Sequence, residues 1–311
     1  MEKQSVNKRI KHIRIIGIII ALLLLILIFM ARLVYRSGVF YEKNRAAVRF
    51  AETERTGEDN NPSPLIDSSG NTVYTRILTP EGFERADADE NGFLGYLRKM
   101  ELMPDGSPVV LYDGEETDFD PAAVYNLDFD SLQQCADSYI RVYSEYLFSA
   151  GKYDEISFRL TNGTVMDYSD WCDGKRLIAF MSFAKMIKLT GNNDSYDAFR
   201  AYLKAVMTYA GTKSLEDSSE KIALDSLTIG DMLLHGGTPG HVSFVVDMAE
   251  NDEGERCFLL AQGFLPARSF HVMKNPAHDD DPWYYASEMS SGTEIKTPNY
   301  VFASDELYRL K

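Results

Sequence analysis

The sequence predicts an α+β protein, in which one N-terminal transmembrane helix precedes a single domain whose antiparallel sheet packs on helices. Three observations predict this class. An uncharged stretch of 17 residues runs from Ile15 to Ala31. Two long segments, 131–150 and 195–210, are each followed by a glycine, as helices often are. Three apolar segments lie between residues 232 and 261 and are separated by turn-forming residues, as in an antiparallel meander.

The uncharged stretch is long enough to cross a bilayer, which takes roughly 17 to 25 apolar residues. A cleaved signal peptide is the alternative, but its apolar region usually spans about 7 to 15 residues and ends at small residues. The exit here, Phe29-Met30-Ala31, lacks that pattern. Five basic residues on each side leave the orientation open. The N-terminal position of the stretch, ahead of one large domain, predicts a cytoplasmic N-terminus and an extracytoplasmic domain at the plasma membrane.

Residues 57–64 (GEDNNPSP) are turn formers and helix breakers, which predicts a linker before the folded domain. The expected partner of the apolar stretch is the lipid bilayer. The predicted parts of the chain are a cytoplasmic basic segment (1–14), a transmembrane helix (15–34), a stalk and linker (35–64) and an exported α+β domain (65–311).

Charge is divided unevenly along the chain. Residues 1–50 carry ten Lys or Arg and two Glu, a net charge of +8, and the whole chain carries −15, which leaves −23 for residues 51–311. Such an acidic domain repels nucleic acid, so a nucleic-acid partner is not expected. Because 45% of the residues are hydrophobic, the acidic part is expected to fold around a core.

Along the exported domain, residues 72–77 and 107–112 predict strands, and residues 93–99 predict a short helix. The clearest helix covers about 131–150, where Asp130 or Ser131 can act as the N-cap and Gln133 or Gln134 as the capping-box partner. Three charged residues spaced by four predict an ion-pair ladder on a solvated face of this helix; they are Asp137, Arg141 and Glu145.

Asn162-Gly163 predicts a hairpin between residues 155–160 and 164–168, because these two residues accept the positive φ angles of a type I′ turn. The same site is formally a glycosylation sequon, but the turn is the favoured interpretation. A second long helix is predicted over about 195–210.

The segment from Gly230 to Gln262 contains the three strands of the predicted meander. A loop rich in Gly and Pro precedes His241, which begins the central strand, and Gln262 ends the next strand. Neighbouring strands can bring these two side chains together, so that Gln262 holds the imidazole by a hydrogen bond. The remaining member of a nucleophile, base and orienter set would be Cys135, early in a helix whose N-terminal dipole lowers a thiol pKa.

Structural roles are the alternative for each member of this set: a core Cys135, a loop-end His241 and a β-edge Gln262. Three cysteines are too few for a disulfide framework, although Cys172 and Cys257 could pair outside the cytoplasm. Neither HExxH nor zinc-type cysteine spacing is present, so no metal or other cofactor is expected.

Four segments resemble the motifs of an uncharacterised bacterial envelope family, domain of unknown function 4846. The resemblance covers about residues 83–310 and implies no particular activity. The segments are LQQCADSYIRVYSEYL (132–147), YAGTKSL (209–215), GDMLLHGGTPGHVSFVVDMA (230–249) and LLAQGFLPARSFHV (259–272).

GDMLLHGG followed by GHVSFVVDM also resembles the strand pair of NlpC-type, papain-like cysteine peptidases and amidases of bacterial envelopes. That resemblance implies a papain-like arrangement in which Cys135 is the nucleophile, His241 the general base and Gln262 the orienter. It covers about 35 residues and one cysteine. The Asp-Cys-Ser-Gly signature of those enzymes is replaced by Gln134-Cys135-Ala136-Asp137.

Two classes of function follow. In the first, the domain is a papain-like thiol hydrolase or transpeptidase acting on an amide bond of the cell wall or of an envelope protein, with Gln133 or Gln134 helping to hold the oxyanion. In the second, it is a non-catalytic envelope domain that binds wall glycan or a partner protein through exposed aromatic side chains. The aromatic residues expected to be exposed are Trp171, Trp283, Tyr284 and Tyr285.

Overall fold

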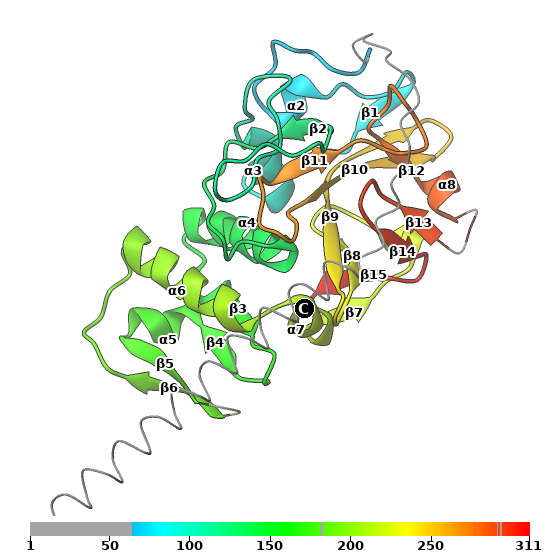
Figure 1. Ribbon diagram of the computed structural model, residues 1–311. Helices are drawn as coiled ribbons and strands as arrows, with labels where there is room; N and C mark the ends of the chain where they lie inside the picture. Colours follow the sequence, from blue (N-terminus) through cyan, green and yellow to red (C-terminus); the bar gives the residue numbers. More distant parts are fainter. Residues whose placement is uncertain (1–63, 181–182, 291, 293) are drawn as a thin grey trace, which may run out of the picture. The chain divides into compact units, whose positions relative to one another are not determined.

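The computed structural model describes residues 64–180, 183–290, 292 and 294–311 (Figure 1). The predicted cytoplasmic segment, the transmembrane helix and nearly all of the stalk and linker lie outside the described residues. Within the described part of the chain, no helix is both long enough and apolar enough to span a membrane. The predicted α+β class is confirmed, because this part contains a large antiparallel sheet and several helices.

The main sheet has nine strands, and all of its pairings are antiparallel. Seven strands follow the order β2-β11-β10-β9-β8-β15-β7, while β1 pairs with β9 and β12 pairs with β10. Neighbouring β8, β9 and β10 are the predicted meander, which is thereby confirmed. The strands are β1 Phe83–Arg85, β2 Pro121–Val124, β7 Ser219–Lys221, β8 Met232–His235, β9 His241–Asn251, β10 Arg256–Gln262, β11 His271–Met273, β12 Tyr284–Tyr285 and β15 Leu307–Leu310.

The meander strands are buried on both faces of the sheet. Successive side chains of a strand point to opposite faces, so Phe244 belongs to one hydrophobic cluster and its neighbour Val245 to another. Leu259 and Leu260 of β10 alternate in the same way. This double burial explains why these strands are nearly continuous apolar runs in the sequence.

Helices and three small hairpins complete the described domain. The helices are α2 Val73–Arg76, α3 Phe93–Lys99, α4 Cys135–Ser149, α5 Tyr168–Cys172, α6 Tyr196–Tyr209, α7 Thr212–Asp217 and α8 Ala286–Ser290, with 3₁₀ turns η1 Tyr153–Glu155 and η2 Leu224–Ser226. The hairpins pair β3 Ser157–Arg159 with β4 Val165–Asp167, β5 Lys175–Phe180 with β6 Phe183–Lys188, and β13 Glu294–Lys296 with β14 Val301–Ala303.

Helix α4 packs on the meander, as predicted. The ring of Tyr139 meets the ring of Phe244 on β9 edge to face, with 5.1 Å between the ring centroids. Such aromatic pairs add about 0.5 to 1.5 kcal/mol to the burial of their area. This contact sets the first turn of α4 near the beginning of β9, where both the predicted nucleophile and the predicted base lie.

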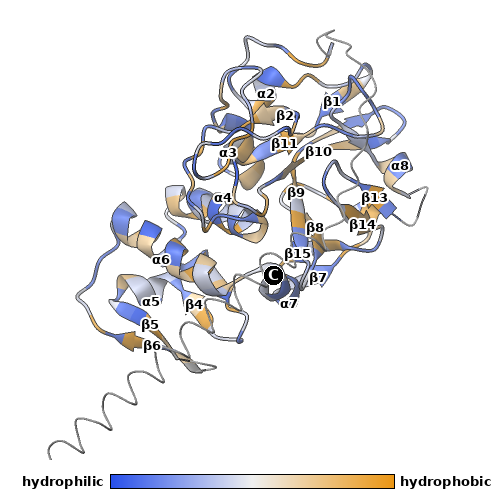
Figure 2. Cartoon of the chain, viewed as in Figure 1, coloured by the Kyte–Doolittle hydropathy of each residue, from blue (hydrophilic) through white to orange (hydrophobic). Residues whose placement is uncertain are grey.

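The predicted hairpin around Asn162-Gly163 and the second long helix are also confirmed. The turn itself differs from the predicted two-residue type I′ turn, because the N–H of Leu160 donates to the carbonyl of Thr164 across a three-residue loop, at the end of which Gly163 has a positive φ of 88°. Ser195 caps α6 by accepting a hydrogen bond from the N–H of Ala198. Figure 2 shows hydrophilic and hydrophobic residues along α6, as expected of a helix with one buried face. From that face the hydroxyl of Tyr202 donates to the carbonyl of Met166 in β4 at 2.7 Å.

Two strand predictions were wrong. Residues 73–76 form the short helix α2, because Thr72 accepts a hydrogen bond from the N–H of Thr75 and caps a helical turn. Residues 107–112 form only isolated bridges, in which Val110 pairs with Glu116 and Leu111 pairs with Arg268. The regular ladder of a strand is missing here, and these residues instead anchor the loop that follows β10.

Asp247 on β9 is completely buried between two arginines. Its Oδ2 lies 2.8 Å from Nη1 of Arg85, and its Oδ1 lies 2.7 Å from Nη2 of Arg98. Arg85 comes from β1 and Arg98 from α3, so one carboxylate joins three elements. A buried charge is tolerated only when it is paired and hydrogen-bonded.

Candidate active site

Cys135 is the first residue of α4, and Gln134 is the N-cap. The helix begins four residues later than the predicted N-terminus, because a turn over residues 130–133 precedes it and Gln134 and Asp137 form the capping box. Oδ1 of Asp130 accepts from the N–H of Leu132 at 2.9 Å, and Oδ2 of Asp137 accepts from the N–H of Gln134 at 3.1 Å. The thiol therefore belongs to the first turn, where the helix dipole is strongest.

His241 begins β9, where it pairs with His235, and Gln262 ends β10. Both side chains are buried, with exposed fractions of 3% and 0%. Gly240 allows the close approach of α7, since a Cβ at this position would lie 2.2 Å from Oγ1 of Thr212. Gly240 is therefore required for the packing of α7 against the loop that precedes His241.

A chain of hydrogen bonds fixes the orientation of the imidazole. Oε1 of Gln262 lies 2.7 Å from Nε2 of His241, while Nε2 of Gln262 lies 3.2 Å from Nε2 of His271 and 2.9 Å from Oδ1 of Asn299. Nδ1 of His271 is 2.7 Å from the carbonyl of Ser269 and must donate to it, so its Nε2 accepts from Gln262. The amide oxygen of Gln262 then accepts from Nε2–H of His241, which leaves Nδ1 of the neutral ring as a proton acceptor.

The thiol of Cys135 lies beside the start of β9. The backbone N–H groups of Ala136, Val242 and Cys135 itself favour the thiolate through hydrogen bonding. Val242 directly follows His241 in the chain, so the thiol lies near the backbone at the start of β9, while the side chains of His241 and Gln262 are hydrogen-bonded to each other. Among the described residues no hydrogen bond joins the thiol to the imidazole. Tyr300 also borders this site, because its ring centroid lies 5.1 Å from that of His241. Burial raises the pKa of the Tyr300 hydroxyl, and the charge of a Cys135 thiolate would raise it further.

The expected lowering of the thiol pKa was wrong. Burial of the sulfur raises the pKa of Cys135 to about 12, and the nearby carboxyl of Asp137 adds to this shift. Part of the residue remains accessible to solvent. Burial also lowers the pKa of His241 to about 4, against the opposing effect of the hydrogen bond that His241 donates to Gln262. At neutral pH the pair is therefore a neutral thiol and a neutral imidazole, because desolvation exceeds the stabilising effect of the helix start.

The predicted solvated face of α4 was also wrong, because Asp137 and Arg141 are buried. Desolvation raises the pKa of Asp137 to about 7 despite the hydrogen bond from Gln134. Only part of the predicted ladder exists: Nε of Arg141 lies 2.6 Å from Oε1 of Glu145, while Asp137 caps the helix instead.

Asp137→Asn is expected to stabilise the protein at pH 8 by about 2 kcal/mol. A carboxyl whose pKa is higher in the folded state than in the unfolded state loses its stabilising contribution as the pH rises toward 7. A shift of three units corresponds to about 4 kcal/mol, and loss of the charged helix cap offsets part of the gain. Urea unfolding of both proteins at pH 8 and pH 5 measures the effect, which should shrink at the lower pH. A variant that is less stable than the wild type at pH 8 would contradict the raised pKa.

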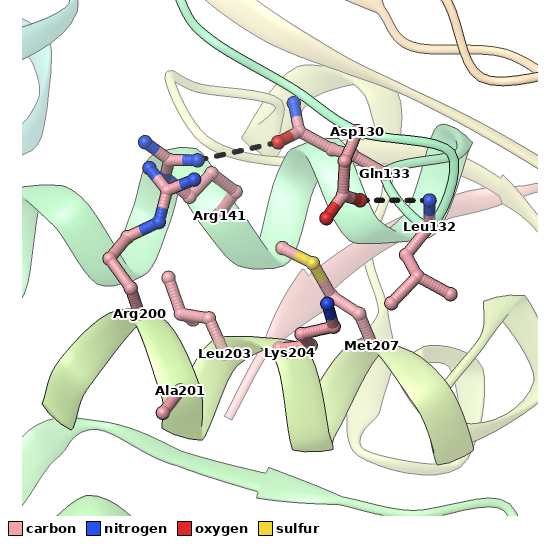
Figure 3. Close-up of a pocket in the computed structure, with 9 residues that line it drawn as sticks. All are labelled: Asp130, Leu132, Gln133, Arg141, Arg200, Ala201, Leu203, Lys204 and Met207. Atoms are coloured by element: carbon pink, nitrogen blue, oxygen red, sulfur yellow. Dashed lines mark hydrogen bonds between the residues drawn. The ribbon is translucent and has the colours of Figure 1, made fainter. Parts of the chain in front are cut away.

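A pocket of about 230 Å³ lies between α4 and α6 (Figure 3). Gln133 and Arg141 line it from one side, and Arg200 and Lys204 from α6. A second pocket of about 400 Å³ is lined by Pro104 to Pro108 and by residues of β2. Cys135, His241 and Gln262 line neither pocket, so the candidate site is defined by its hydrogen bonds and not by either of these two cavities.

The structure also tests the expectations for the three cysteines and for the exposed aromatic residues. Cys135, Cys172 and Cys257 are free thiols, so the pairing of the last two does not occur. The expectation of exposed aromatics was wrong, because Trp171, Trp283 and Tyr284 are buried and Tyr285 is only partly exposed. No group of three or more His, Cys, Asp or Glu side chains in the described ranges could hold a metal ion.

Sequence reasoning missed four residues that complete the site: Ser269, His271, Asn299 and Tyr300. Direct pairing of Gln262 with His271 across β10 and β11 brings the two side chains together. The only signal in the sequence was that His271 stands in a strand-like segment just after Gln262. Asn299 and Tyr300 come from a segment almost 60 residues beyond His241, and no local pattern connects them to it.

Comparison with known proteins identifies the family but no activity. No similar protein was found among curated proteins, and no similar fold was found among solved structures. A family model matches residues 73–309, which include every residue of the candidate site. The chain therefore belongs to the family described as "Domain of unknown function (4846)".

Proposed function

We propose that the protein is a papain-like thiol hydrolase or transpeptidase that acts on an amide bond of the cell wall or of an envelope protein. The hydrogen bond between His241 and Gln262 carries the proposal. It holds the imidazole with Nδ1 available as a base, on a strand whose second residue, Val242, approaches the thiol of Cys135. The order in the chain, a cysteine at a helix start followed by a histidine and an amide on adjacent strands, also agrees with this class.

In the proposed reaction, Nδ1 of His241 removes the thiol proton as Sγ of Cys135 attacks the amide carbonyl carbon. The imidazole is free to accept this proton at pH 7, because its pKa is about 4. Gln262 stabilises the imidazolium that forms, since its carbonyl accepts from Nε2 in either protonation state. The backbone N–H of Cys135 and the side chain of Gln134 are the donors we assign to the oxyanion.

The tetrahedral intermediate then collapses. Its C–N bond breaks, Nδ1–H of His241 gives its proton to the leaving amine, and a thioester remains on Cys135. Water releases an acid in a hydrolase, and a second amine forms a new amide in a transpeptidase; in both cases His241 again takes the proton. The proposed place of this chemistry is the outer side of the plasma membrane, with residues 15–34 as the anchor in the bilayer.

Cys135→Ala is expected to abolish amide cleavage, with a loss of at least about 10³-fold. The assay uses the full chain in detergent and purified wall fragments, with released amines measured by mass spectrometry. Cys172→Ala is the matched control and should leave the rate unchanged, because that thiol lies on α5 and takes no part in the hydrogen-bond chain. The wild type should also accumulate a covalent acyl adduct on Cys135. Equal rates for both variants would overturn the proposal.

One observation favours a second candidate, a non-catalytic envelope domain that binds wall glycan or a partner protein. A pKa of about 12 makes Cys135 a weak nucleophile at rest, as a structural thiol would be. The same assay separates the candidates: wall fragments that sediment with both the wild type and the Cys135→Ala variant, with no amine released by either, would favour the binding domain.

A further inference from the structure

Arg268 is a buried arginine that has no carboxylate partner among the described residues. Only 9% of its surface is exposed, and its buried Nε has no acceptor. In the part of the chain that the structure describes, three other arginines are equally buried, and each has an acidic partner: Arg76 pairs with Asp105, Arg98 with Asp247, and Arg141 with Asp128 and Glu145. The unpaired state of Arg268 is thus the exception among these four buried arginines.

The guanidinium of Arg268 lies beside the candidate active site. Its central carbon is 4.3 Å from the centroid of the Phe264 ring, and that ring is 5.1 Å from the ring of His241. The positive charge of Arg268 contributes to the lowered pKa of both His241 and His271, because it disfavours protonation of the two imidazoles. Phe264 therefore contacts both the guanidinium of Arg268 and the imidazole of His241.

The backbone holds Arg268 in this position. Leu111 forms a bridge with Arg268, and the residues on both sides are bonded as well: the N–H of Tyr112 donates to Ala267, and the N–H of Ser269 donates to Val110. Because the loop is anchored on both sides, the backbone of Arg268 is fixed beside residues 110–112.

Burial of an unpaired charge is strongly unfavourable. Stacking on Phe264 offsets only a small part of this cost, and burial lowers the pKa of Arg268 to about 10. A guanidinium with this pKa is still charged at neutral pH, so a positive charge with an unpaired Nε lies against Phe264, the neighbour of His241. Such an arrangement is complete only when an anion binds.

The chemistry of the surroundings favours a carboxylate. One planar guanidinium matches the two oxygens of a carboxylate in a bidentate pair. In the part of the chain that the structure describes, Arg268 is the charged group that acts on His241, and residues 51–311 together carry −23. A ligand with several phosphate charges would be repelled by such a domain.

We propose that Arg268 binds a carboxylate of the substrate, so that the amide attacked by Cys135 belongs to a peptide with a carboxylate close to the scissile bond. This inference rests on the proposed function and specifies its substrate class. The carboxylate can be the C-terminus of the peptide or the side chain of an acidic residue, since both present the same group to the guanidinium.

The test measures binding without turnover. The full chain with Cys135→Ala in detergent is titrated with acetyl-Ala-Ala, with its C-terminal amide, and with acetyl-Glu amide and acetyl-Gln amide, by calorimetry. A carboxylate-dependent gain in affinity of about 10- to 100-fold is expected for the first or the third probe, as for a hydrogen-bonded ion pair. Whichever acid shows the gain identifies the source of the carboxylate.

Variants assign the effect to Arg268. Arg268→Gln should remove the gain, and Arg268→Lys should restore only part of it, because an ammonium cannot make the planar bidentate pair. Arg159→Gln, at an exposed arginine bonded to the carbonyl of Gly163, is the matched control and should keep the full gain. The thermal midpoint of Arg268→Gln should not fall, since the change removes an unpaired buried charge.

The outcomes separate the two proposals. Equal binding of each acid and its amide, or a full gain in Arg268→Gln, overturns the carboxylate site even if Cys135 proves catalytic. Carboxylate-dependent binding without any cleavage by the wild type supports the site and overturns the hydrolase. In a wild type that cleaves, Arg268→Gln should raise KM for the acid substrate about 10- to 100-fold and leave KM for the amide unchanged.

Discussion

His241→Ala is expected to lower amide turnover by about 10² to 10⁴-fold, the usual contribution of a general base. The loss should be large because the thiol of Cys135 is neutral, with a pKa of about 12, and cannot attack without transferring its proton. In an enzyme with a preformed thiolate the histidine would matter less for this first step. Initial rates with wall fragments at pH 7 measure the effect.

The pH profile of the wild type tests the same assignment. A base acts only when it is unprotonated, and burial lowers the pKa of His241 from its usual value near 6.5 to about 4. Activity should therefore persist between pH 6.5 and pH 5 and fall as the pH drops through about 4. His278→Ala is the control, because His278 is bonded to Glu288 at 2.6 Å and belongs to a different part of the domain. An acidic limb centred near pH 6.5 would contradict a buried neutral base.

Asp247→Asn is expected to cost about 3 to 5 kcal/mol of unfolding free energy, the typical result when one partner of a buried ion pair is removed. The cost arises because Arg85 and Arg98 stay buried while their shared carboxylate becomes neutral. Three elements then lose their connection at once, β1, α3 and β9. Urea unfolding followed by circular dichroism at pH 7 measures the difference.

An exposed ion pair supplies the control for this stability prediction. Lys221 and Asp305 lie 2.8 Å apart with most of both side chains in solvent. Asp305→Asn should change the unfolding free energy by no more than about 1 kcal/mol, because water and salt screen such pairs. Similar losses for Asp247→Asn and Asp305→Asn would show that burial does not determine the strength of these pairs here.

Local patterns predicted a good part of the fold. The hairpin at Asn162-Gly163, the helix that follows Ser195 and the three strands from Met232 to Gln262 each depend on turn chemistry, capping or a strand-length apolar run between turn formers. Local patterns failed at two predicted strands. At Thr72 a helix cap competed with the strand pattern, and at Val110 the strand-like residues form only isolated bridges.

The N-terminus of α4 illustrates the limit of such patterns. Asp130 and Ser131 are good caps by residue type, yet the helix begins at Cys135, because Asp130 caps a preceding turn and Asp137 accepts from the N–H of Gln134. Which of several possible caps is used depends on the contacts of α4 with β9 and β10. A sequence contains the candidates for a cap, while packing selects among them.

The sequence by itself determined the candidates for chemistry, Cys135, His241 and Gln262, and the elements that carry them. Only the tertiary structure decided the protonation states of the thiol and the imidazole. Desolvation depends on every group packed around a side chain, so the raised pKa of Cys135 and the lowered pKa of His241 could not be predicted from a helix start and a strand end. Nor could the sequence predict that Arg268 has no carboxylate partner among the described residues. Whether a buried charge meets a carboxylate depends on residues that come together only in the folded chain.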